Sequence, residues 1–215
     1  MNRLERRSRA DRALAGYTSG PGATRRARDI GLARAKDAGM VVLVEGVSDL
    51  MALEAVAERQ GRDLQSEGMV VLPVGGANAF ERHLEQLRER GIGVRGLVDE
   101  AEEEIVRGAF TATVDGAPGS DAESLGIYVC IEDLEDELIR AIGPSRVEAI
   151  LEREGDLGSF RSLQKQPAWR DRDLTAQLRR FMGAGARRKL RYARLLALEL
   201  APDQIPRPLD HVLKV

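Results

Sequence analysis

The sequence has little cysteine, few aromatic residues and no long apolar run. Its one cysteine, Cys130, excludes an internal disulfide and any zinc cluster built from paired cysteines. Aromatic residues make up only 4% of the chain, which argues against an aromatic platform for stacking single-stranded bases. No apolar run of about 18 residues is present, so no membrane span is expected. Residues 1–17 are basic but lack an apolar core, so we expect no signal peptide and a cytoplasmic location.

Histidines and phosphate-binding motifs are equally sparse. The two histidines, His83 and His211, lie far apart in the sequence, so a zinc site or a catalytic triad built on histidine is not expected. The G-x-x-x-x-G-K-[ST] pattern is absent, which excludes a P-loop. Residues 91–96 match G-x-G-x-x-G, but they precede a predicted strand instead of following one, so a dinucleotide site is not expected there.

The net charge of −2 conceals a strong asymmetry along the chain. Residues 1–38 carry 10 Lys and Arg against 4 Asp and Glu, residues 39–155 carry 10 against 25, and residues 156–215 carry 13 against 6. Basic ends suit a polyanion such as nucleic acid, and an acidic centre suits divalent cations. Solvated helix faces also carry such charges, so both interpretations stay open.

Short runs of apolar, mostly β-branched residues are typical of strands buried on both faces. They cover residues 40–44, 69–74, 94–98 and 126–130. Helical patterns alternate with them, at about 50–60, 78–90 and 131–142. This alternation predicts βαβ units. We therefore expect an α/β protein with a parallel sheet of about four strands flanked by helices.

The patterns also divide the chain into three regions. Residues 1–38 are predicted to form a basic arm and helix, residues 39–142 the α/β domain, and residues 143–215 an α-helical C-terminal region. Within the last region we expect helices at about 144–154, 157–165, 173–182 and 186–200. Residues 110–125 are rich in turn-forming residues, so a surface loop or short hairpin is expected there.

Acidic residues follow two of the predicted strands. Glu45 comes directly after the first strand, Asp49 lies four residues further on, and Asp99 ends the third strand. The carboxyl ends of parallel strands meet at one edge of the sheet, where ligands gather in open α/β folds. Carboxylates brought together there repel one another, and a Mg²⁺-type cation relieves that repulsion. Asp49 alone is equally explained as a residue of the first helical turn, but the three acids together favour a metal site.

A second group of acids lies in the helix predicted after the fourth strand. Its members are Glu132, Asp133, Glu135, Asp136 and Glu137. Most of them should be solvated. Glu135 lies close to the apolar face of that helix, so it is the one expected to point toward the sheet.

Basic residues gather late in the chain and are candidates for gripping phosphates. They are Arg179, Arg180, Arg187, Arg188, Lys189 and Arg191. The helix predicted at about 186–200 carries the last four of these residues on the opposite face from its leucines. A solvated helix face explains the same pattern, so the basic residues alone do not establish a phosphate-binding surface.

These motifs resemble a TOPRIM domain, the fold shared by topoisomerases, bacterial primases and several nucleases. Glu45 and Gly46 after an apolar strand resemble its first motif, and the turn at residues 74–78 resembles its second, glycine-bearing segment. Asp99 after the third strand resembles the start of its Asp-x-Asp motif.

The fuller match is to the TOPRIM region of nucleases of the overcoming lysogenization defect (OLD) family. Glu45 and Asp49 correspond to its Glu-x-x-x-Asp motif. Asp133 and Glu135 fit its Ser/Thr-x-Glu-like motif, and Lys189 is the candidate for its late lysine. The resemblance covers roughly residues 40–200.

The resemblance implies a Rossmann-like TOPRIM domain that uses Mg²⁺ or Mn²⁺ to cleave nucleic-acid phosphodiesters, with DNA favoured over RNA. The implied metal ligands are Glu45, Asp49, Asp99 and Glu135. Lys189 is implied to stabilise charge on the phosphorus, so that Glu45, Asp49, Asp99 and Lys189 form the catalytic set. Because the family's ATPase half has no counterpart here, a separate ATPase partner is a further expectation.

Two departures from the family pattern favour an alternative. The second acid of Asp-x-Asp is Ala101, so one metal site should lack a ligand. Glu102 or Glu103 is a candidate substitute, but a helix starting there would point the two in different directions. Asp133 replaces the Ser or Thr of the later motif. The alternative is a nucleic-acid-binding or regulatory protein on a degenerate TOPRIM core. Primase-like strand synthesis is less favoured, because no zinc-binding module is visible.

Overall fold

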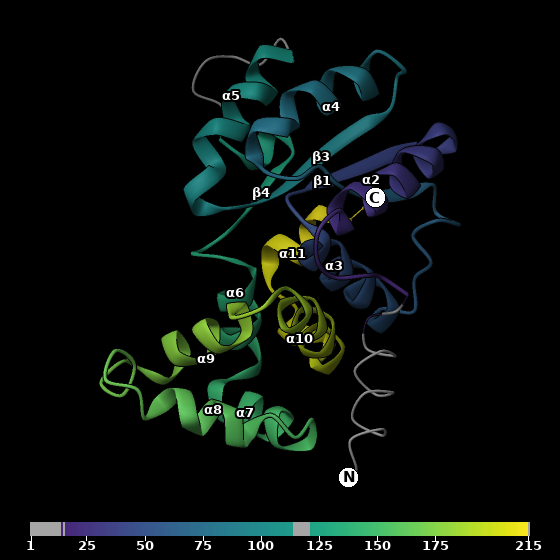
Figure 1. Ribbon diagram of the computed structural model, residues 1–215. Coiled ribbons are helices and arrows are strands. Elements are labelled where there is room, and N and C mark those ends of the chain that lie inside the picture. The colour runs from purple at the N-terminus through teal and green to yellow at the C-terminus, as the bar shows by residue number, and fades with distance from the viewer. Residues whose placement is uncertain (1–13, 15, 114–120, 215) are drawn as a thin grey trace.

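The fold is built on a four-stranded parallel sheet in the strand order β2-β1-β3-β4 (Figure 1). The computed structural model describes residue 14 and residues 16–113 and 121–214. The strands are β1 (Met40–Val44), β2 (Met69–Pro73), β3 (Gly93–Asp99) and β4 (Ile127–Cys130). In the register, Met40 lies opposite Met69 on one side and Gly93 on the other. The carboxyl ends of β1 and β3 therefore lie next to each other.

Helices cover both faces of the sheet. The helices before residue 143 are α2 (Ala23–Arg34), which precedes β1, then α3 (Val47–Arg59), α4 (Phe80–Arg88), α5 (Glu103–Thr113) and α6 (Leu134–Ile142). Successive residues of β1 face opposite layers: Val41 and Leu43 pack with α4 and α5, whereas Val42 and Val44 pack with α3. This is why the strands are continuous apolar runs.

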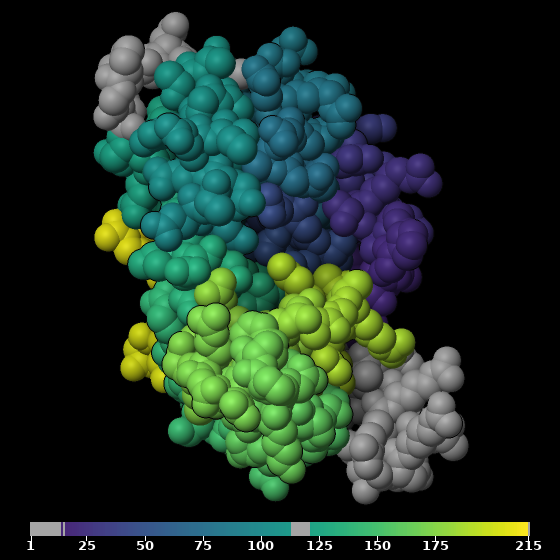
Figure 2. Space-filling view, turned by 60° about the vertical axis from the view of Figure 1, so that its left-hand side comes forward, coloured from purple at the N-terminus to yellow at the C-terminus, as the bar shows by residue number. Residues whose placement is uncertain are grey.

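The chain after residue 143 is helical. Its helices are α7 (Pro144–Arg153), α8 (Leu157–Gln164), α9 (Leu174–Gly183), α10 (Ala186–Glu199) and α11 (Arg207–Val212). Helix α10 lies along α3, so it shares the core of the sheet region (Figure 1). Helices α7, α8 and α9 gather as a lobe below the sheet region (Figure 2). Among the described residues, no helix is long and apolar enough to span a membrane.

The predicted fold class is confirmed, since the four strands and their flanking helices lie where the patterns placed them. One expectation was wrong. The turn-rich stretch was expected to begin at residue 110, but α5 continues to Thr113, because Phe110 is buried against the sheet and holds that turn in helical form. Residues 114–120 lie outside the described part of the chain. The division into three regions stays a prediction.

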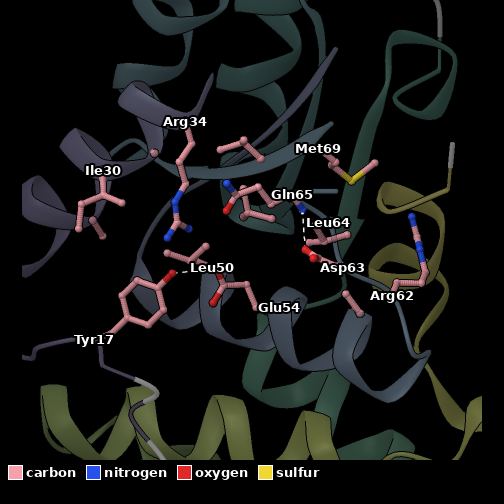
Figure 3. A pocket seen from close by; sticks show the side chains of 15 residues that line it. Tyr17, Ile30, Arg34, Leu50, Glu54, Arg62, Asp63, Leu64, Gln65 and Met69 are labelled. Atoms are coloured by element: carbon pink, nitrogen blue, oxygen red, sulfur yellow. Dashed lines mark hydrogen bonds between the residues drawn. The ribbon is translucent and has the colours of Figure 1, made fainter. Parts of the chain in front are cut away.

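A groove of about 270 Å³ runs between α2, α3 and the segment before β2 (Figure 3). The side chains of Tyr17, Arg34 and Glu54 point toward one another in it, and the Tyr17 hydroxyl donates a 2.8 Å hydrogen bond to Glu54 (Figure 3). Burial raises the pKa of Glu54. None of the acids or basic residues singled out from the sequence lines this groove.

The hydrogen bond across the groove should fasten the segment before α2 to α3. We expect Tyr17→Phe to lower the free energy of unfolding by about 1 kcal/mol, because a part-buried carboxylate loses a donor. Urea unfolding measures the change. Tyr128→Phe is the control, since the Tyr128 hydroxyl makes no hydrogen bond within the described residues. Equal stability of wild type and Tyr17→Phe would contradict the expectation.

Candidate metal centre

Three carboxylates meet at the carboxyl edge of the sheet. Glu45 follows β1 directly, Asp99 is the last residue of β3, and Glu102 lies in the turn after it. One carboxylate oxygen from each lies within 4.8 Å of one from each of the others. The adjacency of β1 and β3 brings Glu45 and Asp99 together, as the strand pattern predicts.

Glu102 joins them because the chain does not enter an α-helix directly after β3. Residues Glu100–Glu102 form a 3-10 turn, η3, before α5 begins at Glu103. A 3-10 turn has three residues per turn, so side chains three positions apart lie one above the other. Glu102, at the end of this turn, lies close to Asp99. Of the two candidate substitutes for the missing acid, Glu102 joins the cluster, whereas Glu103 begins α5 and is not one of its members.

Asp49 lies in the first turn of α3, the position that explains it without a metal, and its charge also acts on the neighbouring acids. Its carboxylate accepts a 2.8 Å hydrogen bond from the Gly46 backbone N–H at the start of α3. The Ser48 hydroxyl donates to its other oxygen at 3.4 Å. Burial raises the pKa of Asp49. After burial, its negative charge adds to the rise in the pKa values of Asp99 and Glu45. Asp49 is not one of the three acids whose carboxylate oxygens lie within 4.8 Å of one another.

Glu135 and Lys189 bring α6 and α10 to the same edge. The Lys189 Nζ lies 3.4 Å from Glu135 Oε2. Glu135 is only 5% exposed, which agrees with its expected orientation toward the sheet. Burial tends to lower the pKa of Lys189, but the charges of Glu135 and Asp49 outweigh it, so the pKa rises and the amine stays protonated. The positive charge of Lys189 also opposes the rise in the pKa values of Glu45, Asp49 and Asp99.

The acids strongly resist ionising together. Burial, followed by the charges of Asp49, Asp133 and Glu45, raises the pKa of Asp99 to about 8. Burial raises the pKa of Glu135 to about 7, although Lys189 opposes the shift. Burial and the charges of Glu102 and Asp49 raise the pKa of Glu45. One protonated lysine therefore does not neutralise the cluster.

The residues present fit a divalent cation. Glu102 Oε2 and Glu135 Oε1 are buried and have no hydrogen-bond partner among the described residues. Buried oxygens of this kind require a proton, a water or a cation. Several clustered carboxylate oxygens, two of them without a donor among the described residues, form the kind of ligand set that Mg²⁺ and Mn²⁺ prefer. Glu45, Asp99 and Glu102 would hold the ion, with Glu135 and Asp49 beside them.

The acidic helix differs from its prediction in one respect. Most of its acids were expected to be solvated, but Asp136 and Glu137 are buried. Both pair with Arg140, at 2.5 and 2.9 Å, and Glu137 also accepts the Ile131 backbone N–H. An arginine one turn away thus allows two acids to be buried. Asp133 is the N-cap of α6 and accepts the N–H of Asp136.

Most of the basic residues predicted to contact nucleic acid have partners within the chain. Arg179 lies 2.7 Å from Asp133, and the Arg188 guanidinium covers the Phe181 ring. Arg180 lies over the Trp169 ring at 5.8 Å, and Arg187 lines a cavity at the start of α10. Their contacts with nucleic acid stay a prediction, as do those of Arg191.

Arg191 and its neighbour anchor α10 to the junction of α7 and α8. Arg191 contacts Glu154 at 3.0 Å and Asp156 at 3.1 Å. The Tyr192 hydroxyl donates to Asp156 at 2.8 Å. These contacts lie two and three residues beyond Lys189. They fix the rotation of α10 that directs Lys189 toward Glu135.

Comparisons with known proteins agree with this geometry. The sequence model of the family described as "Overcoming lysogenization defect protein-like, TOPRIM domain" matches residues 38–100. That segment contains Glu45, Asp49 and Asp99. No curated protein sequence matches the chain.

Solved structures extend the similarity beyond that segment. A structure of the C-terminal region of the Xanthomonas campestris pv. campestris OLD protein matches with 25% identity and a TM-score of 0.60, covering 84% of this chain and 92% of that one. The C-terminal region of the Burkholderia pseudomallei OLD protein matches with 20% identity and a TM-score of 0.57, covering 81% of this chain and 96% of that one. The second match supports the fold alone. This chain therefore contains a TOPRIM domain that resembles the TOPRIM regions of OLD proteins.

Proposed function

We propose that this protein is a Mg²⁺- or Mn²⁺-dependent nuclease that hydrolyses phosphodiesters, with DNA favoured over RNA. The observation that carries the proposal is the set of acids that follow β1 and β3, together with buried oxygens of Glu102 and Glu135 that have no partner in the part of the chain that the structure describes. The TOPRIM domain of the OLD-like type supports a metal-dependent enzyme that acts on nucleic acid. A separate ATPase partner stays a prediction from the resemblance.

The proposed roles follow from position and charge. Glu45, Asp99 and Glu102 hold the cation, and Asp49 orients the start of α3 beside them. The cation supplies charge neutralisation to the phosphate oxygens as negative charge develops there. Lys189 stays protonated beside Glu135 and can donate to a phosphate oxygen from the opposite side. Glu135 holds the Lys189 ammonium at the edge of the site.

A cleavage assay tests the proposal. The purified chain is incubated with supercoiled plasmid, linear DNA and RNA in Mg²⁺, Mn²⁺ or EDTA. We expect cleavage of DNA that requires the metal and that Glu45→Gln reduces by at least about 1000-fold, because the site loses a ligand charge. Absence of cleavage by the wild type, or equal cleavage by Glu45→Gln, would refute the nuclease.

The alternative, a nucleic-acid-binding or regulatory protein on a degenerate core, is favoured by one observation. Ala101 is exposed and offers no ligand at the second position of Asp-x-Asp. Under that alternative the chain binds DNA equally in Mn²⁺ and in EDTA and leaves it intact. The same preparation distinguishes the two functions when binding and cleavage are measured together.

A further inference from the structure

A second feature lies at the carboxyl edge of the sheet, on the β2 side of Glu45. It is a pocket of about 340 Å³, here called the turn pocket, lined by Gly75, Gly76, Asn78, Ala79 and Arg82. The turn is joined to the metal centre by two hydrogen bonds. The Gly75 N–H donates to the Glu45 backbone carbonyl at 2.8 Å, and the Ala77 N–H donates to the Glu45 carboxylate. The turn pocket is therefore adjacent to the acids.

The turn pocket has positive charge where the metal centre has negative charge. Arg82 is an exposed residue of α4, and Arg28 of α2 reaches the same turn by donating to the Val74 carbonyl at 3.2 Å. An Arg82 nitrogen lies 3.4 Å from His83 Nε2, and burial followed by the charges of Arg82 and Arg28 lowers the pKa of His83. Within the described part of the chain, neither arginine forms an ion pair. The charge of both is thus available to an anion.

The backbone of the turn leaves room for a close approach. Gly75 and Gly76 have φ values of 94° and 112°, a region that favours glycine. A Cβ at Gly76 would meet nothing within 4 Å, and one at Gly75 would lie 3.7 Å from the Thr24 methyl of α2. The turn is therefore open to ligand on one side and bordered by α2 on the other.

A buried histidine lies next to Arg82 on α4. His83 is 3% exposed, and its Nδ1 has no hydrogen-bond partner among the described residues. Its Nε2 lies 3.4 Å from an Arg82 nitrogen. Two guanidinium groups and an imidazole therefore lie together with no acid paired to them, which disfavours a cation and favours an anion.

We infer that the turn pocket binds a phosphate group of the nucleic acid strand, next to the phosphodiester held at the metal centre. This inference rests on the proposed function for the position of the second phosphate. An arginine beside an open glycine turn is a combination that proteins use to bind phosphate oxygens. The strand then runs along the carboxyl edge of the sheet, from the end of β3 past Glu45 to the turn after β2.

The inference assigns a role to α2, which lies outside the residues matched by the family model. Its Arg28 lies beside the turn pocket, where it donates to the Val74 carbonyl, so under this inference the basic region before the sheet contributes to the strand path. The shared chemistry is a phosphate, which can be an internal phosphodiester or a terminal 5′-phosphate. The experiment separates these two sources.

Binding is measured by fluorescence anisotropy with a labelled single strand and a duplex of about 20 nucleotides, longer than one site. Ca²⁺ replaces Mn²⁺ to slow cleavage, and salt is varied. We expect Arg82→Ala to weaken binding about tenfold and to lower the slope of log affinity against log salt by about one. Arg82→Glu should weaken binding further, and Arg28→Ala should resemble Arg82→Ala.

The matched control is Arg90→Ala. Arg90 is exposed and lies beyond the other end of α4, about 12 Å along the helix axis from Arg82. It should leave affinity and salt slope unchanged. Thermal unfolding checks that each variant folds. A wild-type preference for a 5′-phosphorylated strand that Arg82→Ala removes assigns the pocket to a terminal phosphate, and equal binding of both strands assigns it to an internal one.

The outcomes separate this inference from the nuclease. If the wild type cleaves DNA while Arg82→Ala and Arg28→Ala keep wild-type affinity, salt slope and KM, the turn pocket is refuted and the nuclease stands. If the wild type binds DNA through Arg82 but cleaves nothing in Mg²⁺ or Mn²⁺, the nuclease is refuted and the turn pocket stands. If the wild type binds neither strand nor duplex, the inference is overturned.

Discussion

Replacing Glu102 by glutamine should weaken Mn²⁺ binding about 100-fold, as severely as Asp99→Asn. Glu102 supplies one of the three closely spaced carboxylates, and one of its oxygens is buried without a partner. Glutamine keeps the shape of the side chain but removes the charge that attracts the ion. Removing groups that only support metal ligands already costs about 10–100-fold in affinity, so a ligand should cost at least as much. Calorimetric titration with Mn²⁺ measures the effect.

Two further variants make this expectation specific. Glu100→Gln removes the same charge from an exposed residue of the same turn, and it should bind Mn²⁺ like the wild type. Ala101→Asp restores the second acid of the Asp-x-Asp pattern. In the Glu102→Gln background it should recover part of the lost affinity. If Glu102→Gln and Glu100→Gln bind Mn²⁺ equally well, Glu102 is not a ligand.

The affinity for Mn²⁺ should rise roughly 100-fold between pH 6 and pH 8. The pKa of Asp99 is about 8, so at pH 6 its carboxylate carries a proton that the metal must displace. One displaced proton gives about a tenfold gain in affinity per pH unit below that pKa. Glu135, with a pKa of about 7, steepens the dependence below pH 7. Above about pH 8 the affinity should level off.

The metal-free protein should respond to pH in the opposite direction. The pKa of Asp99 is raised in the folded state from its ordinary value of 3.8, so the folded protein binds a proton that the unfolded chain releases. Stability is therefore greatest at low pH within this window and falls as the pH rises from about 4 to about 8. Thermal unfolding in EDTA measures this fall, and Mn²⁺ should reverse it at pH 8.

Asp99→Asn separates the contribution of Asp99 from other titrations. Asparagine resembles the protonated carboxyl group, so the metal-free variant should lose the part of the decline in stability that Asp99 causes, and the fall that remains below about pH 7 belongs to Glu135 and its neighbours. A variant that declines as steeply as the wild type would show that other groups cause the pH dependence. Proton release on Mn²⁺ binding, measured in buffers with different ionisation enthalpies, provides an independent check.

The sheet was predictable because its signals are local. Strands β1 and β2 are apolar runs followed by Glu45 and by the Gly75-Gly76 turn, and the order of strands and helices restricts the topology to parallel βαβ units. The meeting of Glu45 and Asp99 follows from that topology. The burial of Glu135 was readable from its place between two leucines.

The remaining features depend on contacts that the local sequence does not record. Whether residues 100–102 form a 3-10 turn or an α-helix changes the direction of Glu102, and the residue types allow either geometry. Arg179 belongs to a basic cluster in the sequence, yet it pairs with Asp133, 46 residues earlier. The glycine turn after β2 was recognisable from the sequence, but Arg28 and Arg82 were not placed beside it, because they belong to two other elements, α2 and α4.

The attachment of α10 has a consequence for control of the reaction. Lys189 is carried by the same helix whose Arg191 and Tyr192 are tied to Glu154 and Asp156. If the protein is the proposed nuclease, a displacement of the junction between α7 and α8 would rotate α10 and move the Lys189 ammonium away from Glu135 without touching the acids at the sheet edge. The two ends of this coupling are close together, because Lys189 lies only two residues before Arg191 on the same helix.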